Sequence, residues 1–356
     1  MSELEVLAPE VLVNVEGAVG RLTLNRPKAL HALTTTMCRL MTDALLAWRA
    51  DDAVQAVLID HSGERGFCAG GDIRMLADSA AAGGAAARAF FFTEYRLNHL
   101  LFGYPKPVIA MMDGVTMGGG VGLSYPARYR IATERTTFAM PETGIGLFPD
   151  VGGSWFLPRL HGSTGAWIAL TGARLKAADC ELLGIATDVV AAERLPALKA
   201  AIIADPAAVE TLLAELESDS SPAPISQHRE DIDRLFAAPT LEGVFAALQG
   251  DGSEWAAAQL AILRVKSPLS MKTALRELQA GAAMTDFAQA MTMEMRIAAR
   301  IVMSDDFTEG VRAVIVEKDN TPRWRPAALE GVTETMLDAV FAPLPPDQEW
   351  SPLPNL

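Results

Sequence analysis

The sequence predicts an α/β fold followed by a mainly helical C-terminal region, and three observations support this prediction. A buried strand, a glycine-rich loop and a helix follow one another twice near the start of the chain. The strands in these units are almost wholly apolar, which is typical of strands covered on both faces. From Leu195 onwards, apolar residues recur at helical spacing almost to the end. We therefore expect an α/β core over residues 1–195 and a mainly helical region over residues 196–356 that covers the functional site.

The N-terminal segments give the clearest local patterns. Val11 to Val15 and Arg21 to Asn25 alternate between apolar and polar residues on either side of Glu16-Gly17, which predicts a β-hairpin. Thr34 to Trp48 has apolar residues at helical spacing, and its threonines suit an N-cap. Ala53 to His61 is a mostly apolar run and is predicted to be a buried strand.

Two glycine loops follow predicted strands. The first is SGERGFCAGGDIRML, in which Gly66, Gly70 and Gly71 break regular structure and Asp72 stands where a helix can begin. The second is the triple glycine Gly118–Gly120, which follows the apolar strand KPVIAMMDG. Glycine lets a backbone approach a ligand closely, and the N–H groups at the start of a helix favour negative charge. Each loop is therefore a candidate anion-binding segment.

The other expected elements follow from periodicity and composition. An alanine- and glycine-rich mobile loop is expected at Ala80 to Ala89, grading into a helix at Phe90 to Phe102. The stretch from Asp219 to Pro224, rich in serine and proline, is the best candidate for a linker. We expect strands at 128–133, 136–140 and 186–191, and helices at 163–171, 177–183, 254–265, 268–280 and 285–303.

Two acids, Glu142 and Asp150, lie on a proline-punctuated loop close to the second glycine cluster. Two glycine loops, each after a buried strand, can bring one N–H apiece to a shared point and form an oxyanion hole. Loss of one such donor typically raises the barrier by about 3 kcal/mol. The acids are candidates to attack, to activate water or to move protons. The alternative is a tight turn with solvated acids.

Composition and motifs exclude several classes. The 356 residues carry a net charge of −14, which argues against nucleic acid or an anionic membrane as a partner. Three scattered cysteines and an acidic N-terminus without a basic leader predict free thiols and a cytoplasmic protein. The five histidines lack metal-binding spacing, and GxSxG, HExxH, the Walker lysine and GxGxxG are absent.

The motifs ERGFCAGGDI, MDGVTMGGGVGL and PETGIGLFPDVGG together resemble the crotonase superfamily of acyl-CoA enzymes. The resemblance implies a crotonase-type spiral of ββα units in which the N–H groups of Gly71 and Gly119 hold the thioester carbonyl. It implies that coenzyme A is part of the substrate, with no bound cofactor or metal, and that a homo-oligomer, a trimer or hexamer, forms. Further substrate contacts are assigned by the resemblance to Gly70, Asp72, Gly118, Ala29 and Lys318.

Within the superfamily, TMGGGVGLS, FAMPETGIGLFPDVGG, DFTEGVRA and the late KDxxPxW segment resemble the branch that hydrolyses 3-hydroxyisobutyryl-CoA in valine breakdown. Enoyl-CoA hydratases carry a second glutamate two residues after the triple glycine, where this chain has Gly122. The resemblance makes Glu142 the catalytic acid, as general base or nucleophile, and Asp150 the second acid. Glu94 is implied to hydrogen-bond the 3-hydroxyl of the substrate.

Two alternatives remain open at this point. One is an enoyl-CoA hydratase or isomerase, against which Gly122 argues because hydration needs both acids. The other is a non-catalytic acyl-CoA binding protein that has kept the fold. The presence of Glu142, Asp150 and both glycine loops argues against it.

Overall fold

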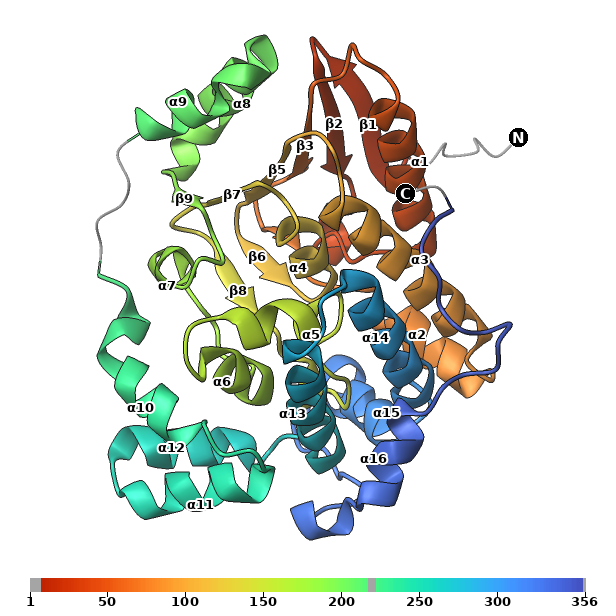
Figure 1. Ribbon diagram of the computed structural model, residues 1–356, viewed down its shortest axis with the longest axis vertical. Coiled ribbons are helices and arrows are strands. Elements are labelled where there is room, and N and C mark those ends of the chain that lie inside the picture. Colours follow the sequence, from red (N-terminus) through yellow and green to blue (C-terminus); the bar gives the residue numbers. More distant parts are fainter. Residues whose placement is uncertain (1–7, 217–221, 355–356) are drawn as a thin grey trace.

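The computed structural model describes residues 8–216 and 222–354, and Figure 1 shows two β-sheets with helices packed around them. The larger sheet has six strands. The predicted hairpin is confirmed, because its first two strands pair antiparallel, and all the others run parallel. In order across the sheet, these strands are β1 (Val11–Glu16), β2 (Val19–Leu24), β3 (Ala56–His61), β5 (Val108–Met112), β7 (Tyr129–Ala132) and β9 (Asp188–Val189).

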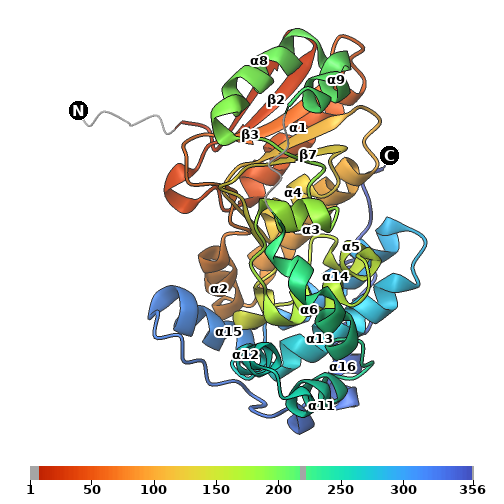
Figure 2. The same cartoon turned by 90° about the vertical axis from the view of Figure 1, so that its left-hand side faces the viewer.

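Strand β3 is buried on both faces, as predicted. Val57 and Ile59 belong to the main core, together with the buried face of α1 (Thr35–Arg49). Ala56 and Leu58 point the other way, into a second cluster closed by α8 (Leu195–Ala204) and α9 (Val209–Ala214). Figure 2 shows α8 and α9 lying over this face of the sheet.

The smaller sheet was only partly predicted. It contains β4 (Gly66–Cys68), β6 (Val115–Met117) and β8 (Thr137–Ala139), in that order and all parallel. Strand β8 was expected, whereas Gly66 was expected to break regular structure and β6 was not expected at all. Both missed strands have three residues, too few for an alternating pattern to show.

The mobile loop predicted at Ala80 to Ala89 is wrong. Helix α2 (Ile73–Ala81) runs into this stretch and α3 (Ala85–Phe102) already begins within it. The Ser79 hydroxyl accepts a hydrogen bond from the Ala87 N–H across 2.8 Å and so ties the two helices together. Alanine is the strongest helix former, and this preference prevails over the short glycine interruption.

The remaining helices follow β6 along the chain. The first half of the linker expected at Asp219 to Pro224, residues 219–221, lies outside the described residues. The bounds are α4 (Gly119–Ser124), α5 (Gly153–Phe156), α6 (Thr164–Thr171), α7 (Ala177–Leu182), α10 (Arg229–Leu235), α11 (Leu241–Asp251), α12 (Glu254–Leu263), α13 (Pro268–Ala282), α14 (Phe287–Ile301), α15 (Asp305–Val311) and α16 (Glu334–Phe341).

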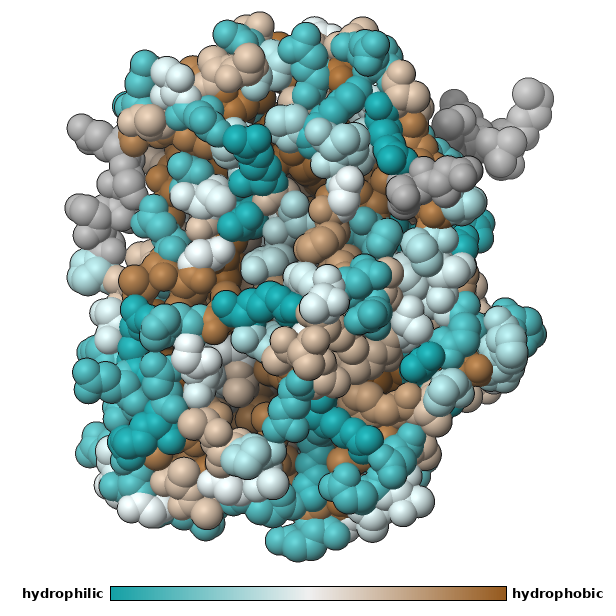
Figure 3. Space-filling model, viewed as in Figure 1, coloured by the Kyte–Doolittle hydropathy of each residue, from teal (hydrophilic) through white to brown (hydrophobic). Residues whose placement is uncertain are grey.

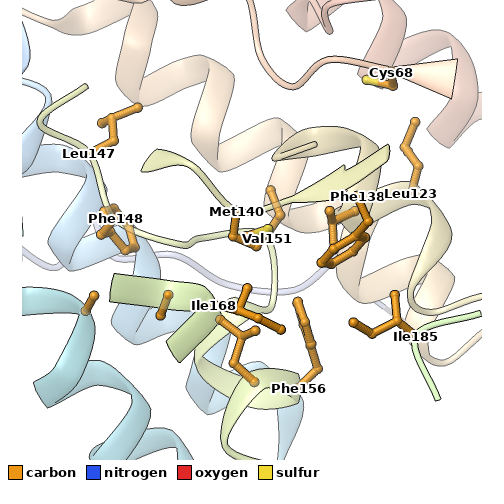
Figure 4. Close-up of a cluster of buried hydrophobic side chains, with 14 of the residues drawn as sticks. Cys68, Leu123, Phe138, Met140, Leu147, Phe148, Val151, Phe156, Ile168 and Ile185 are labelled. Carbon is orange, nitrogen blue, oxygen red and sulfur yellow. The ribbon is translucent and has the colours of Figure 1, made fainter. Parts of the chain in front are cut away.

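Three late helices pack around the segment that carries the two candidate acids. Helix α13 contacts α5 and α6, α14 contacts α3 and α5, and α15 contacts α2. The backbone N–H of Ser267, the N-cap of α13, donates to the carbonyl of Thr143 across 3.1 Å. Figure 4 shows buried side chains from β8, the loop after it, α5 and α6, including Phe138, Met140, Phe148, Val151, Phe156 and Ile168.

The surface carries hydrophilic residues spread over the face seen in Figure 3. Among the helices that the structure describes, none combines the length and the apolar character needed to cross a membrane.

Candidate active site

The candidate site lies at one edge of the small sheet. Strand β4 leads to Gly70-Gly71, β6 to Gly118-Gly119 and β8 to Pro141-Glu142. Because the strands are parallel neighbours, their carboxyl ends meet at the same edge. A cavity opens there, lined by residues of these three segments, of α2 and α3, and of the loop before α5: Ala69, Gly70, Gly71, Ile73, Leu76, Phe90, Phe91, Glu94, Met117, Gly118, Gly119, Pro141, Glu142, Ile145, Leu147 and Asp150.

The two glycine loops touch each other. A Cβ placed on Gly118 would stand 3.3 Å from the Cα of Gly70. Gly70 has φ 112° and Gly118 has φ 45° with ψ −119°, backbone conformations that residues with a side chain rarely adopt. Glycine is therefore required at both positions for the approach and for the turn.

Within the described part of the chain, the backbone pairing beside the two loops does not use the N–H groups of Gly71 and Gly119. Where Leu33 pairs with Gly71, the hydrogen bonds run from the Leu33 N–H to the Gly70 carbonyl and from the Asp72 N–H to the Leu33 carbonyl. Gly119 is the first residue of α4, where an N–H has no acceptor within the helix. Both donors belong to residues that line the cavity.

Glu142 begins a short 3-10 helix (Glu142–Gly144) directly after β8 and is 6% exposed. Its Oε2 has no hydrogen-bond partner among the described residues. A Cβ on Gly118 would stand 3.2 Å from its Oε1, so the carboxyl group lies beside the second glycine loop. Burial and then the nearby Asp150 charge raise the pKa of Glu142 well above its ordinary value, while Lys266 opposes this shift.

Asp150 lies across the cavity on the same loop. Its Oδ2 accepts a hydrogen bond from the hydroxyl of Tyr95 on α3, across 2.9 Å. Burial raises the pKa of Asp150 to about 6, and the Tyr95 hydrogen bond limits the rise because it favours the ionised form.

Glu94 projects from α3 and is only 2% exposed. Its Oε1 has no partner among the described residues, and a Cβ on Gly119 would stand 2.6 Å from it. Burial, followed by the charges of Asp150 and Glu294, raises the pKa of Glu94 well above its ordinary value. A buried carboxyl oxygen without a partner is free to bond a polar group of a ligand.

Position 122 leaves no room for a side chain. A Cβ on Gly122 would stand 2.6 Å from Nδ2 of Asn98 and 2.7 Å from Cβ of Val151. Both neighbours are buried, and Val151 directly follows Asp150. The place where a second acid would project from α4 is thus filled by α3 and by the loop that carries Asp150.

Seven of the ten residues predicted for the site line this one cavity, and three do not. Asp72 caps the N-terminus of α2, accepting from the Met75 N–H, and pairs with Arg26 at 3.1 Å. Ala29 is exposed on a 3-10 turn (Pro27–Ala29), and Lys318 is exposed on a late turn with φ 58°. Contacts of these three with coenzyme A stay predictions.

Other residues near the site were not predicted. Tyr95 follows Glu94 in the helical sequence and its pairing with Asp150 has no sequence signal. Glu277 on α13 and Glu294 on α14 are completely buried, although the helices that carry them read as ordinary amphipathic segments. Lys266 lies between α12 and α13. Burial lowers its pKa, and the Glu142 charge opposes this decrease.

The fold and the site are those of a crotonase-type acyl-CoA enzyme. The family described as enoyl-CoA hydratase/isomerase matches residues 19–341, and the chain belongs to that family within the crotonase superfamily. Among solved structures, a carnitinyl-CoA dehydratase from Mycobacterium thermoresistibile superposes with TM-score 0.92 and 40% identity, covering 97% of this chain and 99% of the other. An enoyl-CoA hydratase from Rhodobacter sphaeroides gives TM-score 0.88 and 39% identity over 96% and 99%. The expected fold is confirmed.

Curated relatives identify the branch. The chain is 44% identical over 347 residues to the mitochondrial 3-hydroxyisobutyryl-CoA hydrolase of Danio rerio, covering 94% of this chain and 90% of that protein. The human enzyme of the same name is 42% identical over 353 residues, with 97% and 91% covered. The predicted resemblance is confirmed. These relatives are mitochondrial by name, which contradicts the cytoplasmic location that the sequence predicted.

Proposed function

We propose that this protein hydrolyses the thioester of a short-chain β-hydroxyacyl-CoA, with 3-hydroxyisobutyryl-CoA as the substrate and 3-hydroxyisobutyrate and CoA as the products, a step of valine breakdown. One observation carries the proposal. Glu142 and Asp150 line the same cavity as the two glycine N–H donors, whereas position 122 has no space for the second acid of a hydratase. The names of relatives at 42–44% identity support the substrate.

Binding would place the thioester carbonyl oxygen between the N–H groups of Gly71 and Gly119. Both donors sit in glycine loops that pack against each other, so their positions are set before the substrate arrives. Negative charge that develops on the oxygen is then stabilised without rearrangement of the site. Gly70 and Gly118 make this possible through their backbone conformations.

Glu142 supplies the main chemical step by one of two routes. As a general base, it takes a proton from a water molecule whose oxygen attacks the carbonyl carbon. As a nucleophile, it attacks that carbon itself and forms a mixed anhydride that water then cleaves. In both routes the carbon–sulfur bond breaks and the CoA thiolate leaves and takes up a proton. Asp150 orients the acyl group or the water and assists the proton transfer.

Glu94 accounts for the preference for a hydroxylated acyl group. Its carboxyl group is buried at the cavity wall and has an oxygen without a partner among the described residues. A substrate hydroxyl that reaches this oxygen would satisfy it, whereas an acyl chain without a hydroxyl leaves it unpaired. Such a difference is a strong source of discrimination in buried sites.

The outer part of the substrate is assigned more coarsely. The CoA arm is expected along the turn that contains Ala29 and the loop that ends at Asp72, with Lys318 near a phosphate. Substitution of Lys318 by Ala, with KM for the CoA thioester as the readout, tests this placement. Assembly as a trimer or hexamer also stays a prediction, which sedimentation of the purified protein would test. The absence of a bound cofactor stays a prediction as well, which its absorption spectrum would test.

A second candidate function is hydration of an enoyl-CoA, because two solved structures that closely resemble this chain carry the names of a dehydratase and a hydratase. One pair of assays separates the two functions. Release of free thiol from 3-hydroxyisobutyryl-CoA is measured against loss of crotonyl-CoA absorbance. Thiol release without hydration is the expected result, and rapid hydration without thiol release would overturn the proposal. Binding of the CoA thioester without either reaction would indicate a non-catalytic binding protein.

A further inference from the structure

We propose that Glu294 is a positioning residue for Asp150: a buried carboxyl group on α14 that holds the turn after Asp150 in the conformation the reaction needs. The inference rests on the proposed function for its kinetic consequence. Its structural part concerns the turn alone. Nothing in the sequence around Glu294 distinguishes this residue from an ordinary helical glutamate.

The turn after Asp150 has an unusual backbone. The Gly153 N–H donates to the Asp150 carbonyl across 2.8 Å, which closes a four-residue turn. Its two central residues, Val151 and Gly152, have φ values of 52° and 95°. A β-branched residue such as valine very rarely adopts a positive φ, and such strain persists only where the surroundings hold it. The turn therefore needs an external support.

Glu294 provides that support. Its Oε2 accepts from the Gly152 N–H across 2.9 Å, and its Oε1 accepts from the Ser154 N–H across 3.1 Å and from the Ser154 hydroxyl across 2.5 Å. Both oxygens of the Glu294 carboxyl group and all three donors lie in the protein interior. One side chain thus fixes the backbone on both sides of Gly153, two to four residues after Asp150.

Helix α14, which carries Glu294, also packs against the helix that carries Tyr95, the hydrogen-bond partner of Asp150. Helix α14 packs against α3, which carries Tyr95, and against α5, which the turn leads into. Tyr95 holds the Asp150 carboxyl group from one side, and Glu294 holds the backbone from which this side chain projects. If the turn relaxes, the Asp150 carboxyl moves relative to Tyr95 and to the substrate carbonyl.

Glu277 on the adjacent helix α13 is a matched control. It is also a completely buried glutamate, and the Asp150 and Glu294 charges act on it. Neither of its carboxylate oxygens has a hydrogen-bond partner among the described residues, so it does not hold the turn. The substitution Glu277→Gln therefore repeats the chemical change and the burial of Glu294→Gln without the contact.

The experiment compares Glu294→Gln, Ser154→Ala and Glu277→Gln with the wild-type protein in two measurements. For hydrolysis of 3-hydroxyisobutyryl-CoA, Glu294→Gln is expected to lower kcat by about 10- to 100-fold with little change in KM, because a small misplacement of an acid costs rate rather than binding. Ser154→Ala removes one of three bonds and is expected to show a smaller loss in the same direction. Glu277→Gln is expected to keep the wild-type kcat.

The second measurement is amide hydrogen exchange of the peptide that contains residues 150–156, which does not depend on activity. Exchange is expected to rise in Glu294→Gln and not in Glu277→Gln. Three results would overturn the proposal. The first is hydrogen exchange in Glu294→Gln that equals that of the wild-type protein, and the second is an unchanged kcat in Glu294→Gln. The third is a loss of kcat in Glu277→Gln as large as that in Glu294→Gln. If the wild-type protein releases no thiol, the proposed function fails, and hydrogen exchange still decides whether Glu294 holds the turn. If Glu294→Gln does not fold, Ser154→Ala decides by the same two measurements.

Discussion

The hydroxyl of Tyr95 donates a hydrogen bond to Oδ2 of Asp150 across 2.9 Å, and this bond joins α3 to the loop that carries both acids. Tyr95 is completely buried, whereas Asp150 is half-buried at the wall of the cavity. A hydroxyl that donates to a carboxylate favours its ionised form. The bond therefore opposes the effect of burial, which raises the pKa of Asp150 to about 6.

Substitution of Tyr95 by Phe is expected to raise the pKa of Asp150 further. The acidic limb of the pH profile of kcat/KM should then move upward by about one pH unit, because a hydrogen bond to a charged group contributes about 1.5–3 kcal/mol. Thiol release measured from about pH 5 to pH 9 gives the profile. An acidic limb that stays in place would mean that Asp150 is not ionised in the active form or that another group sets the limb.

Substitution of Glu142 by Gln is expected to abolish hydrolysis while affinity for the CoA thioester is largely retained. The amide has nearly the shape of the carboxyl group but neither attacks a carbonyl nor accepts a proton from water. Thiol release and calorimetric binding of the CoA thioester measure the two properties. Unchanged turnover in this variant would show that Glu142 has no chemical role.

Substitution of Glu94 by Gln is expected to act mainly on binding of the hydroxylated acyl group. KM for 3-hydroxyisobutyryl-CoA should rise by about tenfold, which corresponds to about 1.4 kcal/mol. Isobutyryl-CoA, which lacks the hydroxyl, serves as the control substrate and should be affected much less. An equal rise for both substrates would refute the contact between Glu94 and the hydroxyl.

Substitution of Gly122 by Ala is expected to destabilise the protein by about 1–3 kcal/mol, as overpacking of a filled interior does. The added Cβ would meet Asn98 and Val151 at 2.6 and 2.7 Å. Gly250 in α11 has nothing within 4 Å of an added Cβ, so Gly250→Ala should instead be neutral or stabilise the helix. Thermal unfolding compares the two variants. Equal stability of both would mean that position 122 has space for a side chain.

The buried glutamates predict that stability falls as the pH rises. Burial raises the pKa of Glu277 well above its ordinary value and that of Glu294 to about 8. A group whose pKa is raised by folding contributes stability that is present below its unfolded pKa and is lost as the pH rises through its folded pKa. The Tm should therefore be lower at about pH 8 than at about pH 5.

Glu277→Gln isolates one of these groups. The amide does not titrate, so this variant should gain a few degrees in Tm relative to the wild-type protein at about pH 8 and much less at about pH 5. A gain of the same size at both values would show that packing rather than ionisation explains it.

Much of the site could be predicted because its parts are adjacent in the sequence to recognisable strands. Gly71, Gly119 and Glu142 each follow a strand within a few residues, so parallel pairing of these strands is enough to bring them together. The burial of the glutamates on α13 and α14 could not be predicted in this way. A glutamate in an amphipathic helix is usually solvated, and only the packing of the folded chain shows that Glu277 and Glu294 are buried.

Short strands and loops were the other features that could not be predicted from the sequence. The strands β4 and β6 have three residues each, and their pairing comes from the tertiary arrangement rather than from local preference. The two glycines before Ala85 suggest a loop, whereas α2 and α3 are separated by only three residues. The Tyr95–Asp150 pair spans 55 positions and leaves no pattern in a single sequence.

Helices α13 and α14 support the segment that carries Glu142 and Asp150, and this has a consequence for synthesis of the protein. The Thr143 carbonyl accepts a hydrogen bond from the Ser267 N–H, and the Gly152 N–H donates to Glu294, which lies 142 positions later in the chain. A nascent chain that has left the ribosome only as far as α9 already contains both glycine loops, Glu142 and Asp150, but not these bonds. Such an unfinished chain lacks the bonds that fix this segment, so under the proposed function it becomes active only after α13 and α14 have been synthesised.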